Sequence, residues 1–479
     1  MKKSILILEI TSALCLVTSY MKADNVLTSS TTQTVSGQTY TSTTADQSAV
    51  KVTAGTLTIT KCKLYNSGNA SSTDNASFYG TNAVMLAYGS STSPVINSSY
   101  NYVAGSGTGS NGIFAYGKGV VKTSYDKIYQ TGGNSRAIMA SGGGTVTVIG
   151  DTATTVNGSS SVIATDRGSG TINVTGGIYT ANGSNSAGLY STGVISATDA
   201  TFISNGGEIY VIEGSNSINV TNCKGTSNKN KWGILMYQSF SGDAEGSTGT
   251  FTATGGSLDY EGTCGGLFYN TNATAKIYLN GVTITNKCDT LVRSLKGGWG
   301  NNATASSGGT TYIYATDQTM SGMIYADANS KDYITLSGST AYTNAKINPG
   351  NVASLVTLTM DATSTLSLAS DCYINGAISI SGLTSGSIVS NISGNGHSIY
   401  YTKSTNSGLN GATYSLTNGG YLLPLGTNGI SSIEDATESV TTVYTLNGVI
   451  TSSDNLTPGI YIVRTVNGNV VTTKKIIVK

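Results

Sequence analysis

Charged side chains, histidine and proline are scarce in this chain of 479 residues. Charged residues make up 10% of the sequence, against about 25% in an ordinary globular protein. The formal net charge is +1 and no basic run interleaves with aromatic residues, so the sequence predicts no nucleic-acid partner. With one histidine, His397, and no pair of cysteines at metal-binding spacing, we expect neither a metal site nor another cofactor.

Glycine and tyrosine are abundant instead, with 61 and 29 copies, together with many Ser, Thr and Asn residues. Tyrosine and β-branched residues favour strands, and Gly and Asn favour the tight turns that join strands. This composition predicts an all-β protein.

The first 23 residues have the pattern of an export signal. Lys2 and Lys3 form a positively charged start, an apolar run follows over residues 5–17, and Ala23 precedes the expected cleavage point. No later run is long enough to span a membrane as a helix. We therefore expect residues 1–23 to be a signal peptide and the mature chain to be secreted, either extracellular or attached to the outer-membrane surface.

A short pattern recurs through the middle of the chain: a small residue, two or three apolar residues and then a polar one. GIFA at 112–115 and AIMA at 137–140 are two copies, and successive copies start 21 to 33 residues apart. Two more strand-like runs lie between copies, such as TVTV at 145–148 and GIYT at 177–180. Three short strands per repeat, joined by Gly and Asn bends, predict a right-handed parallel β-helix over residues 24–329.

The competing interpretation of this repeat is a β-sandwich or a barrel. A β-sandwich or barrel would show a regular series of two-residue hairpin turns, and the sequence lacks that series.

From 330 to 429 the pattern loosens but stays rich in strand-forming residues. We expect this part to form irregular coils and a cap, because an open solenoid end would expose strand edges and core.

Two neighbouring repeats carry a resemblance to known proteins. SGGGTVTVIGDTATTVNGSSSVIAT and GSGTINVTGGIYTANGSNSAGLYST each place a Gly-flanked strand before a Gly- and Ser-rich element that ends in apolar residues. They resemble the passenger repeats of surface adhesins and autotransporters, over roughly residues 80–325. The resemblance implies an extended β-helix that acts at the cell surface.

The last fifty residues differ from the repeats. ISSIEDATES at 430–439 predicts a linker, and residues 440–479 contain YTLNG at 444–448, LTPGIYIVR at 456–464 and KKIIV at 474–478. This order resembles the C-terminal sorting domain of the type IX secretion system, which implies the export machinery as a partner of residues 440–479. The alternative is an ordinary terminal module, either β-sandwich-like or a hairpin.

An enzyme of the polysaccharide lyase or glycosidase type needs acidic groups on one sheet. Asp166 and Glu213 each lie four residues past the start of their repeat copy, two coils apart, with Arg167 adjoining. Coil spacing places their backbones about 10 Å apart, near the wider carboxylate spacing of inverting glycosidases. We favour the alternative that both are solvated acids at coil corners, and expect no catalysis.

Binding candidates are more numerous. Tyrosines that we interpret as outward-facing could bind sugars or another protein, or could pack across coils. The binding candidates among them are Tyr179, Tyr190, Tyr210, Tyr237 and Tyr269, and Tyr278, Tyr312, Tyr314 and Tyr325 share the pattern. Cys264 and Cys288, 24 residues apart, would fall within disulfide range on adjacent coils, or form two buried thiols.

These features favour an adhesin-like protein that binds host or environmental glycans or surface proteins without catalysis. A carbohydrate-active β-helix enzyme and a purely structural surface stalk are the alternatives.

Overall fold

The computed structural model describes residues 24–229, 231–297, 307–383, 388–426, 440–452, 456–467 and 470–478. The expected signal peptide and the expected linker at 430–439 lie outside these residues. The chain divides into two units, and the boundary between them along the sequence falls between Leu425 and Gly426.

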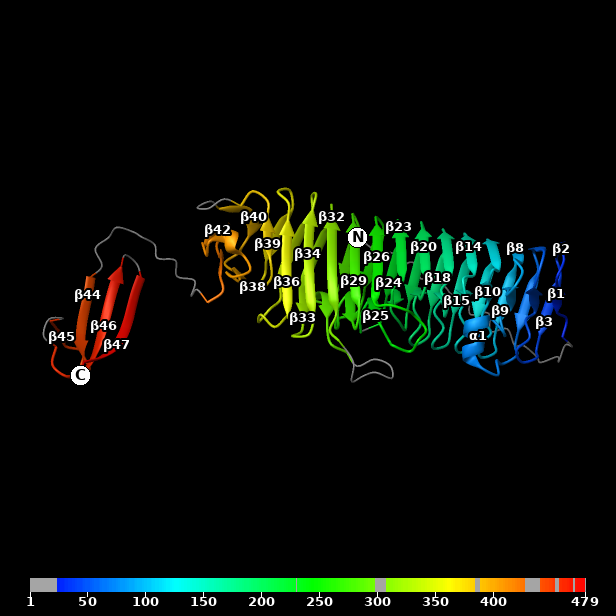
Figure 1. Cartoon of the computed structure of the whole chain (residues 1–479), viewed down its shortest axis with the longest axis horizontal. Helices are drawn as coiled ribbons and strands as arrows, with labels where there is room; N and C mark the ends of the chain where they lie inside the picture. Colours follow the sequence, from blue (N-terminus) through cyan, green and yellow to red (C-terminus); the bar gives the residue numbers. More distant parts are fainter. Residues whose placement is uncertain are drawn as a thin grey trace, which may run out of the picture. The chain divides into compact units, whose positions relative to one another are not determined.

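The first unit is a parallel β-solenoid, which confirms the fold predicted from the repeats (Figure 1). Its strands form three long sheets, here named sheets A, B and C, and each strand pairs in parallel with its equivalent in the next coil. In sequence order, a coil contributes one strand to sheet B, one to sheet C and one to sheet A.

Sheet A contains β3 (Thr39–Ser42), β6 (Lys63–Asn66), β9 (Tyr102–Gly105), β12 (Lys127–Gln130), β15 (Thr152–Thr155), β18 (Ile178–Ala181), β21 (Thr201–Ser204), β24 (Lys224–Ser227), β27 (Ser257–Tyr260) and β30 (Thr283–Asn286). Sheet C contains β2 (Gln33–Ser36), β5 (Thr56–Thr60), β8 (Val95–Ser99), β11 (Val120–Ser124), β14 (Thr145–Ile149), β17 (Thr171–Thr175), β20 (Val194–Thr198), β23 (Ser217–Thr221), β26 (Thr248–Thr254), β29 (Thr274–Asn280), β32 (Thr310–Thr316), β34 (Lys331–Ser337), β36 (Leu355–Met360) and β39 (Ile378–Ile380).

Sheet B contains β1 (Leu27–Ser29), β4 (Val50–Val52), β7 (Met85–Gly89), β10 (Ile113–Gly117), β13 (Ile138–Ser141), β16 (Ile163–Thr165), β19 (Leu189–Ser191), β22 (Tyr210–Glu213), β25 (Ile234–Tyr237), β28 (Phe268–Thr271), β31 (Thr290–Ser294), β33 (Thr319–Ala326), β35 (Ala341–Ile347), β37 (Thr365–Leu368), β38 (Cys372–Ile374), β40 (Val389–Ser393), β41 (Ile399–Tyr401), β42 (Tyr414–Thr417) and β43 (Tyr421–Pro424). The helix α1 (Thr73–Tyr79) and the 3-10 helix η2 (Ser407–Leu409) interrupt the coils.

The core is a set of apolar ladders that run from coil to coil. In sheet C, Val146, Ile172, Ile195 and Ile218 occupy the same register position on successive strands, and all four are fully buried. Burial of an Ile or Val side chain contributes about 1.5–3 kcal/mol, so each added coil extends the core that the previous coil left open.

The corner between sheets C and A has one residue per coil in the left-handed backbone region. Gly150, Gly176, Asp199 and Asn222 hold it with φ between 51° and 66°, and each N–H donates to a carbonyl of the following coil. Gly, Asn and Asp are the residue types that adopt this conformation most readily, whereas other L-residues lose roughly 1–2 kcal/mol there. Three coils depart from this rule, with Lys61, Tyr100 and Tyr125 at the corner, and they are taken up below.

Beyond β30 the coils change. Sheet A ends, and β33 and β35 lengthen to eight and seven residues, each with a register shift. β33 and β35, which lie on either side of residue 330, pair in parallel, so the stacking of coils continues past that residue. The described part of this unit ends with the antiparallel pair β42 and β43. That pair ends the otherwise parallel stacking.

The second unit is a small antiparallel sheet in the order β45–β44–β46–β47. Its strands are β44 (Val440–Thr445), β45 (Ile450–Thr451), β46 (Gly459–Asn467) and β47 (Val470–Val478). β46 and β47 form a long hairpin, with Gly459 opposite Val478. The expected C-terminal hairpin module is therefore present as an antiparallel sheet.

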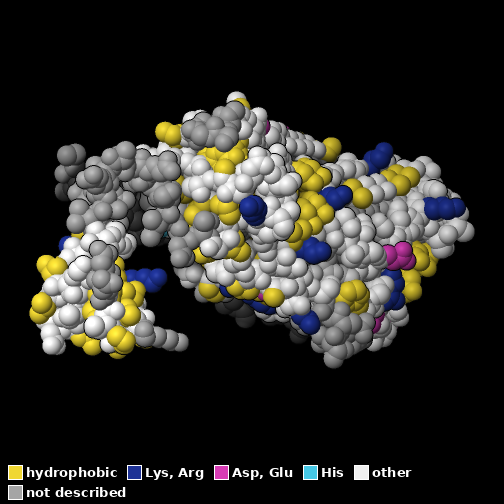
Figure 2. All heavy atoms as spheres, turned by 60° about the vertical axis from the view of Figure 1, so that its left-hand side comes forward, with side chains coloured by type: hydrophobic (Ala, Val, Ile, Leu, Met, Phe, Trp, Pro, Cys, Tyr) yellow, Lys and Arg dark blue, Asp and Glu magenta, His cyan; other side chains and the backbone are white. Residues whose placement is uncertain are grey.

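Charge is sparse on the surface as well as in the composition. The face of the solenoid in Figure 2 has isolated Lys and Arg side chains and few acidic ones. A place where several charged groups meet is therefore unusual in this molecule.

Candidate functional site

The outer face of sheet B places residues that are far apart in sequence in one column. Ala164, Tyr190 and Val211 lie at the same register position on β16, β19 and β22. Two residues further along, the same register aligns Asp166, Thr192 and Glu213. The alignment of Asp166 and Glu213 two coils apart, expected from the repeats, therefore agrees with the register.

Helix α1 covers one end of this column. The Ser72 hydroxyl accepts a bond from the Asn75 N–H at 3.1 Å, and Gly80 ends the helix with φ 68°. A Cβ at Gly80 would lie 2.8 Å from the Phe114 ring, so only glycine lets the helix end pack this closely on sheet B. The sequence therefore builds a wall of the site from an N-terminal cap, a seven-residue helix and a glycine.

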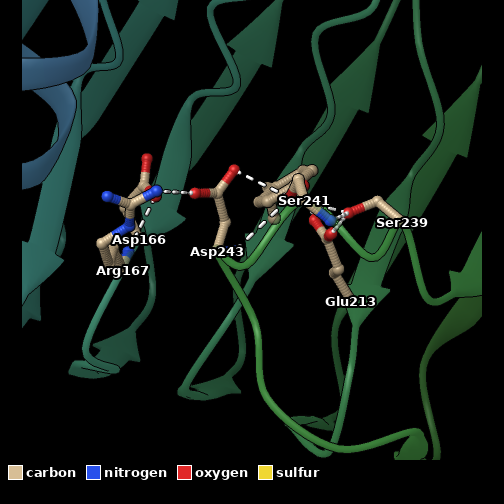
Figure 3. Close-up of polar contacts among 7 residues, drawn as sticks. Asp166, Arg167, Glu213, Ser239, Ser241 and Asp243 are labelled. Carbon is tan, nitrogen blue, oxygen red and sulfur yellow. Dashed lines mark hydrogen bonds and ion pairs between the residues drawn. The ribbon is translucent and has the colours of Figure 1, made fainter. Parts of the chain in front are cut away.

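The loop of residues 238–247, between β25 and β26, covers the other end. The Arg167 Nη2 atom forms an ion pair with Asp243 Oδ1 at 2.8 Å (Figure 3). The guanidinium also lies 4.0 Å from the centre of the Phe78 ring on α1. Ser241 donates to the other oxygen of Asp243 at 3.0 Å. Arg167 thus links the loop to the helix and is a positioning residue for both walls.

Glu213 lies beneath the loop and is 2% exposed. Ser239 donates to its carboxylate (Figure 3). Tyr190 also donates to this carboxylate, and Tyr237 donates to Oε2 at 3.0 Å. Burial raises the pKa of Tyr190 and of Tyr237, which keeps both hydroxyls protonated as donors. A carboxylate that is covered and bonded in this way holds the loop in place and does not reach solvent.

Between α1 and the loop lies a pocket of about 150 Å³. Its lining includes Arg136, Asp166, Tyr190, Thr192 and Asp243. Burial raises the pKa of Asp166, and the Arg136 guanidinium opposes that rise. The pocket therefore combines a carboxyl group with a raised pKa, a guanidinium, an aromatic ring and a hydroxyl beside the strands of sheet B.

The catalytic candidates from the sequence separate in the structure. Asp166 lines the pocket, Glu213 is closed off under the loop, and Arg167 is engaged with Asp243 and Phe78. Asp166 and Glu213 therefore share a column without both facing one cavity.

Two of the tyrosines expected to face outward do not. Tyr179 and Tyr210 are fully buried, so their assignment as surface-binding residues is wrong. Tyr179 stacks on Phe202 at 5.2 Å, and Tyr210 meets the same ring edge-on at 5.8 Å. The register with the neighbouring coils places Tyr179 beside the buried Ala153 and Phe202, so Ile178 faces out and Tyr179 faces in.

The remaining tyrosine candidates do lie on outer faces. Tyr190 is half-buried at the pocket, whereas Tyr237 and Tyr269 are each 7% exposed. The Tyr269 ring is stacked on Trp232 at 4.2 Å. On sheet C, Tyr278 stacks on Tyr314 at 4.7 Å, which is the cross-coil packing weighed as the alternative.

Of the two alternatives left open for Cys264 and Cys288, a disulfide or two thiols, the structure has two unbonded cysteines. β28 and β31 keep the expected 24-residue offset, with Phe268 opposite Val292. Gly265 and Gly266, with φ 83° and 153°, turn the chain just before β28. Cys264 is consequently exposed while Cys288 is buried.

Sequence reasoning missed Arg136, Asp243 and Phe78. Phe78 lies in the helix and Asp243 in the loop, both of unique sequence, so no repeat pattern indicates their places over sheet B. Arg136 directly precedes the repeat copy at 137–140, and the pattern does not include its position. One signal was available: the segments 67–84 and 238–247 lengthen their coils and so had to cover a neighbouring face.

Comparison with known proteins gives no relative: no family model matches the chain, and no curated protein matches it. In the described part of the chain, no helix has the length and apolar character needed to cross a bilayer. The described residues also contain no group of three or more His, Cys, Asp or Glu side chains that could hold a metal ion.

Proposed function

We propose that this protein is an exported, cell-surface β-solenoid that binds a glycan in the sheet B pocket without chemical turnover. The export pattern of residues 1–23 and the resemblance of residues 440–479 to a sorting domain support the surface location and the export machinery as a partner. Binding follows from the pocket, because hydroxyl-rich ligands are held by a few convergent polar groups beside an aromatic ring.

The observation that carries the proposal is the meeting of Arg136, Asp166, Thr192 and Tyr190 in one pocket of a chain with few charges. Isolated charges at coil corners would be solvated and scattered. Here the walls are fixed by the Arg167–Asp243 ion pair and by the bonds to Glu213. A pre-formed wall lowers the ordering cost of binding.

Binding is favoured over catalysis because only one of the two carboxylates aligned in the column is accessible. Glycoside cleavage by the usual route needs two carboxyl groups that face the same bond. Glu213 is covered and accepts bonds from three hydroxyls. Of the other acids that line the pocket, Asp243 is occupied by Arg167, and Asp74 is exposed in the first turn of α1.

The test is a glycan-array screen with the full chain, followed by calorimetry on the best ligand. Asp166→Ala should weaken binding about tenfold, the loss of one charge-assisted hydrogen bond. Asp259→Ala is the matched control, because Asp259 is a half-buried acid on sheet A, away from the pocket. Equal affinity of the Asp166 variant and the wild type would refute the proposal, as would the absence of any glycan ligand.

The second candidate is a carbohydrate-active enzyme, and one observation favours it. The raised pKa of Asp166, beside Arg136 and facing a pocket that also holds Asp243, is the environment of a general acid. The same glycans should be assayed for new reducing ends and for unsaturated uronic acids. Turnover that Asp166→Asn abolishes would replace the binding proposal, whereas binding without turnover would support it.

A further inference from the structure

Two tyrosines occupy the corner between sheets C and A in a conformation that disfavours them. Tyr100 and Tyr125 have φ of 56° and 54°, where the next four coils place Gly, Gly, Asp and Asn. Their N–H groups bond to Ser124 and Ile149 of the following coils at 3.1 and 2.9 Å, so the corner geometry is the same. The strain therefore comes from the choice of residue and not from a different turn.

Packing does not account for this strain. Tyr100 is 60% and Tyr125 53% exposed, so neither ring contributes much to the core. The two rings stack at 5.4 Å with planes 15° apart, and a Cβ at Gly150 would lie 2.7 Å from the Tyr125 ring. Gly150, at the next corner, therefore leaves room for the Tyr125 ring because it has no side chain. Strained, exposed side chains held in a defined arrangement point to a binding role.

The adjacent strands of sheet A extend this aromatic surface. Tyr102 on β9 and Tyr129 on β12 are 37% and 43% exposed. Tyr102 lies in register between Lys63 on β6 and Lys127 on β12, both of which are exposed. We name Tyr100, Tyr102, Tyr125, Tyr129, Lys63 and Lys127 the Tyr–Lys face.

The charge of this face has one sign. The other outward positions of these three strands are Tyr65 and Ala104, and the corner that precedes Tyr100 is Lys61. The nearest acid along the chain, Asp126, is fully buried and accepts a bond from the Asn101 N–H at 2.7 Å. Three ammonium groups therefore flank the rings with no carboxylate on the surface between them.

We propose that the Tyr–Lys face binds an extended acidic polysaccharide. Sugar rings present flat C–H faces that pack on tyrosine rings, and the carboxylates of uronic acids pair with lysine ammonium groups. The coils repeat about every 4.8 Å, so the face offers a regular row of contacts to a regular chain. This site lies on other sheets than the sheet B pocket and does not depend on the function proposed for that pocket.

The experiment measures binding of the full chain to polygalacturonate, with neutral dextran as the uncharged comparison. The key variant is Tyr100→Asn with Tyr125→Asn, because Asn tolerates the left-handed conformation and occupies the same corner at 222. We expect affinity for polygalacturonate to fall more than about tenfold, the loss of two aromatic contacts, with an unchanged or higher unfolding temperature.

Three further variants make the test specific. Lys63→Gln with Lys127→Gln, both at exposed positions, should weaken binding and flatten its dependence on salt. Tyr278→Asn is the matched control, because Tyr278 is also exposed and stacked but lies on sheet C. Asp166→Ala should leave this binding unchanged, which separates the face from the sheet B pocket.

Several results would overturn the proposal. These are equal binding of wild type to polygalacturonate and dextran, or affinity retained in the double tyrosine or double lysine variant. A large drop in unfolding temperature of the tyrosine variant would instead assign the two rings a packing role. Equally tight binding of duplex DNA would show a general polyanion surface in place of a polysaccharide site.

Discussion

Asp332 offers a sharp test of how this solenoid holds charge in its interior. It points inward from β34 and is fully buried. The Ser294 hydroxyl lies 2.6 Å from its Oδ1 atom, and Oδ2 has no hydrogen-bond partner among the described residues. Burial raises the pKa of this carboxyl from the ordinary 3.8 to about 7. We predict that Asp332→Asn stabilises the protein above pH 7 and changes little at pH 4.

The magnitude follows from proton linkage. A carboxyl with a raised folded pKa holds its proton in the native state while the unfolded chain has lost it. Stability is therefore complete below pH 3.8 and falls as the pH rises to about 7, after which it is constant. The difference between these two pKa values corresponds to about 4 kcal/mol, an upper estimate. Asparagine carries no charge at any pH and removes this loss.

The assay is amide hydrogen exchange, read on peptides from β32, β34 and β36 between pH 5 and 8.5. Local opening is the appropriate measure, because a long repeat array does not unfold as one cooperative unit. Asp126 and Asp151, whose pKa values burial raises to about 6 and about 7, are present in both proteins and cancel in the comparison. A stability difference that is the same at pH 5 and pH 8 would refute the reasoning.

Three further predictions concern the core, the loop and the cysteines. Tyr179→Ala should lower the free energy of local opening by about 3–5 kcal/mol, because its ring is fully buried against Phe202. Amide hydrogen exchange on peptides from β15, β18 and β21 measures this loss, and a loss below about 1 kcal/mol would contradict the placement of Tyr179. Arg167→Ala should change stability by less than about 1 kcal/mol, because the Arg167 side chain is 48% exposed. The same variant should speed limited proteolysis within residues 238–247, because the loop loses its ion pair through Asp243. An unchanged cleavage rate would rule out this link. Cys264, which is exposed, should react with iodoacetamide in the native protein, whereas Cys372, whose thiol pKa burial raises to about 12, should react only after unfolding; mass spectrometry of labelled peptides distinguishes the two.

The repeat pattern was sufficient for the fold and insufficient for the faces of individual tyrosines. In a run such as TVTV at 145–148, polar and apolar residues alternate, which predicts that the valines face the core. Val146 and Val148 are indeed buried. GIYT at 177–180 contains two large apolar residues in adjacent positions, so alternation alone does not say which one faces in. The register with Ala153 and Phe202 on the neighbouring strands places Tyr179 inward.

The candidate site was half visible in the sequence. Asp166 and Glu213 could be aligned because each lies four residues past the start of its repeat copy. Their environments differ because the 238–247 loop folds over Glu213 and leaves Asp166 at the edge of a pocket. That loop has no repeated counterpart from which its path could be predicted.

The sequence by itself determined the local rules: short strands, left-handed corners and an apolar position in each strand, which together require stacked coils. Only the tertiary structure decided which coils, loops and helix meet across those strands. Arg167 reaches Asp243, 76 residues away, because coil lengths and loop paths accumulate along the stack. A local pattern sets the shape of each coil, but contacts between coils depend on the sum of all the turns between them, and no single repeat contains that information.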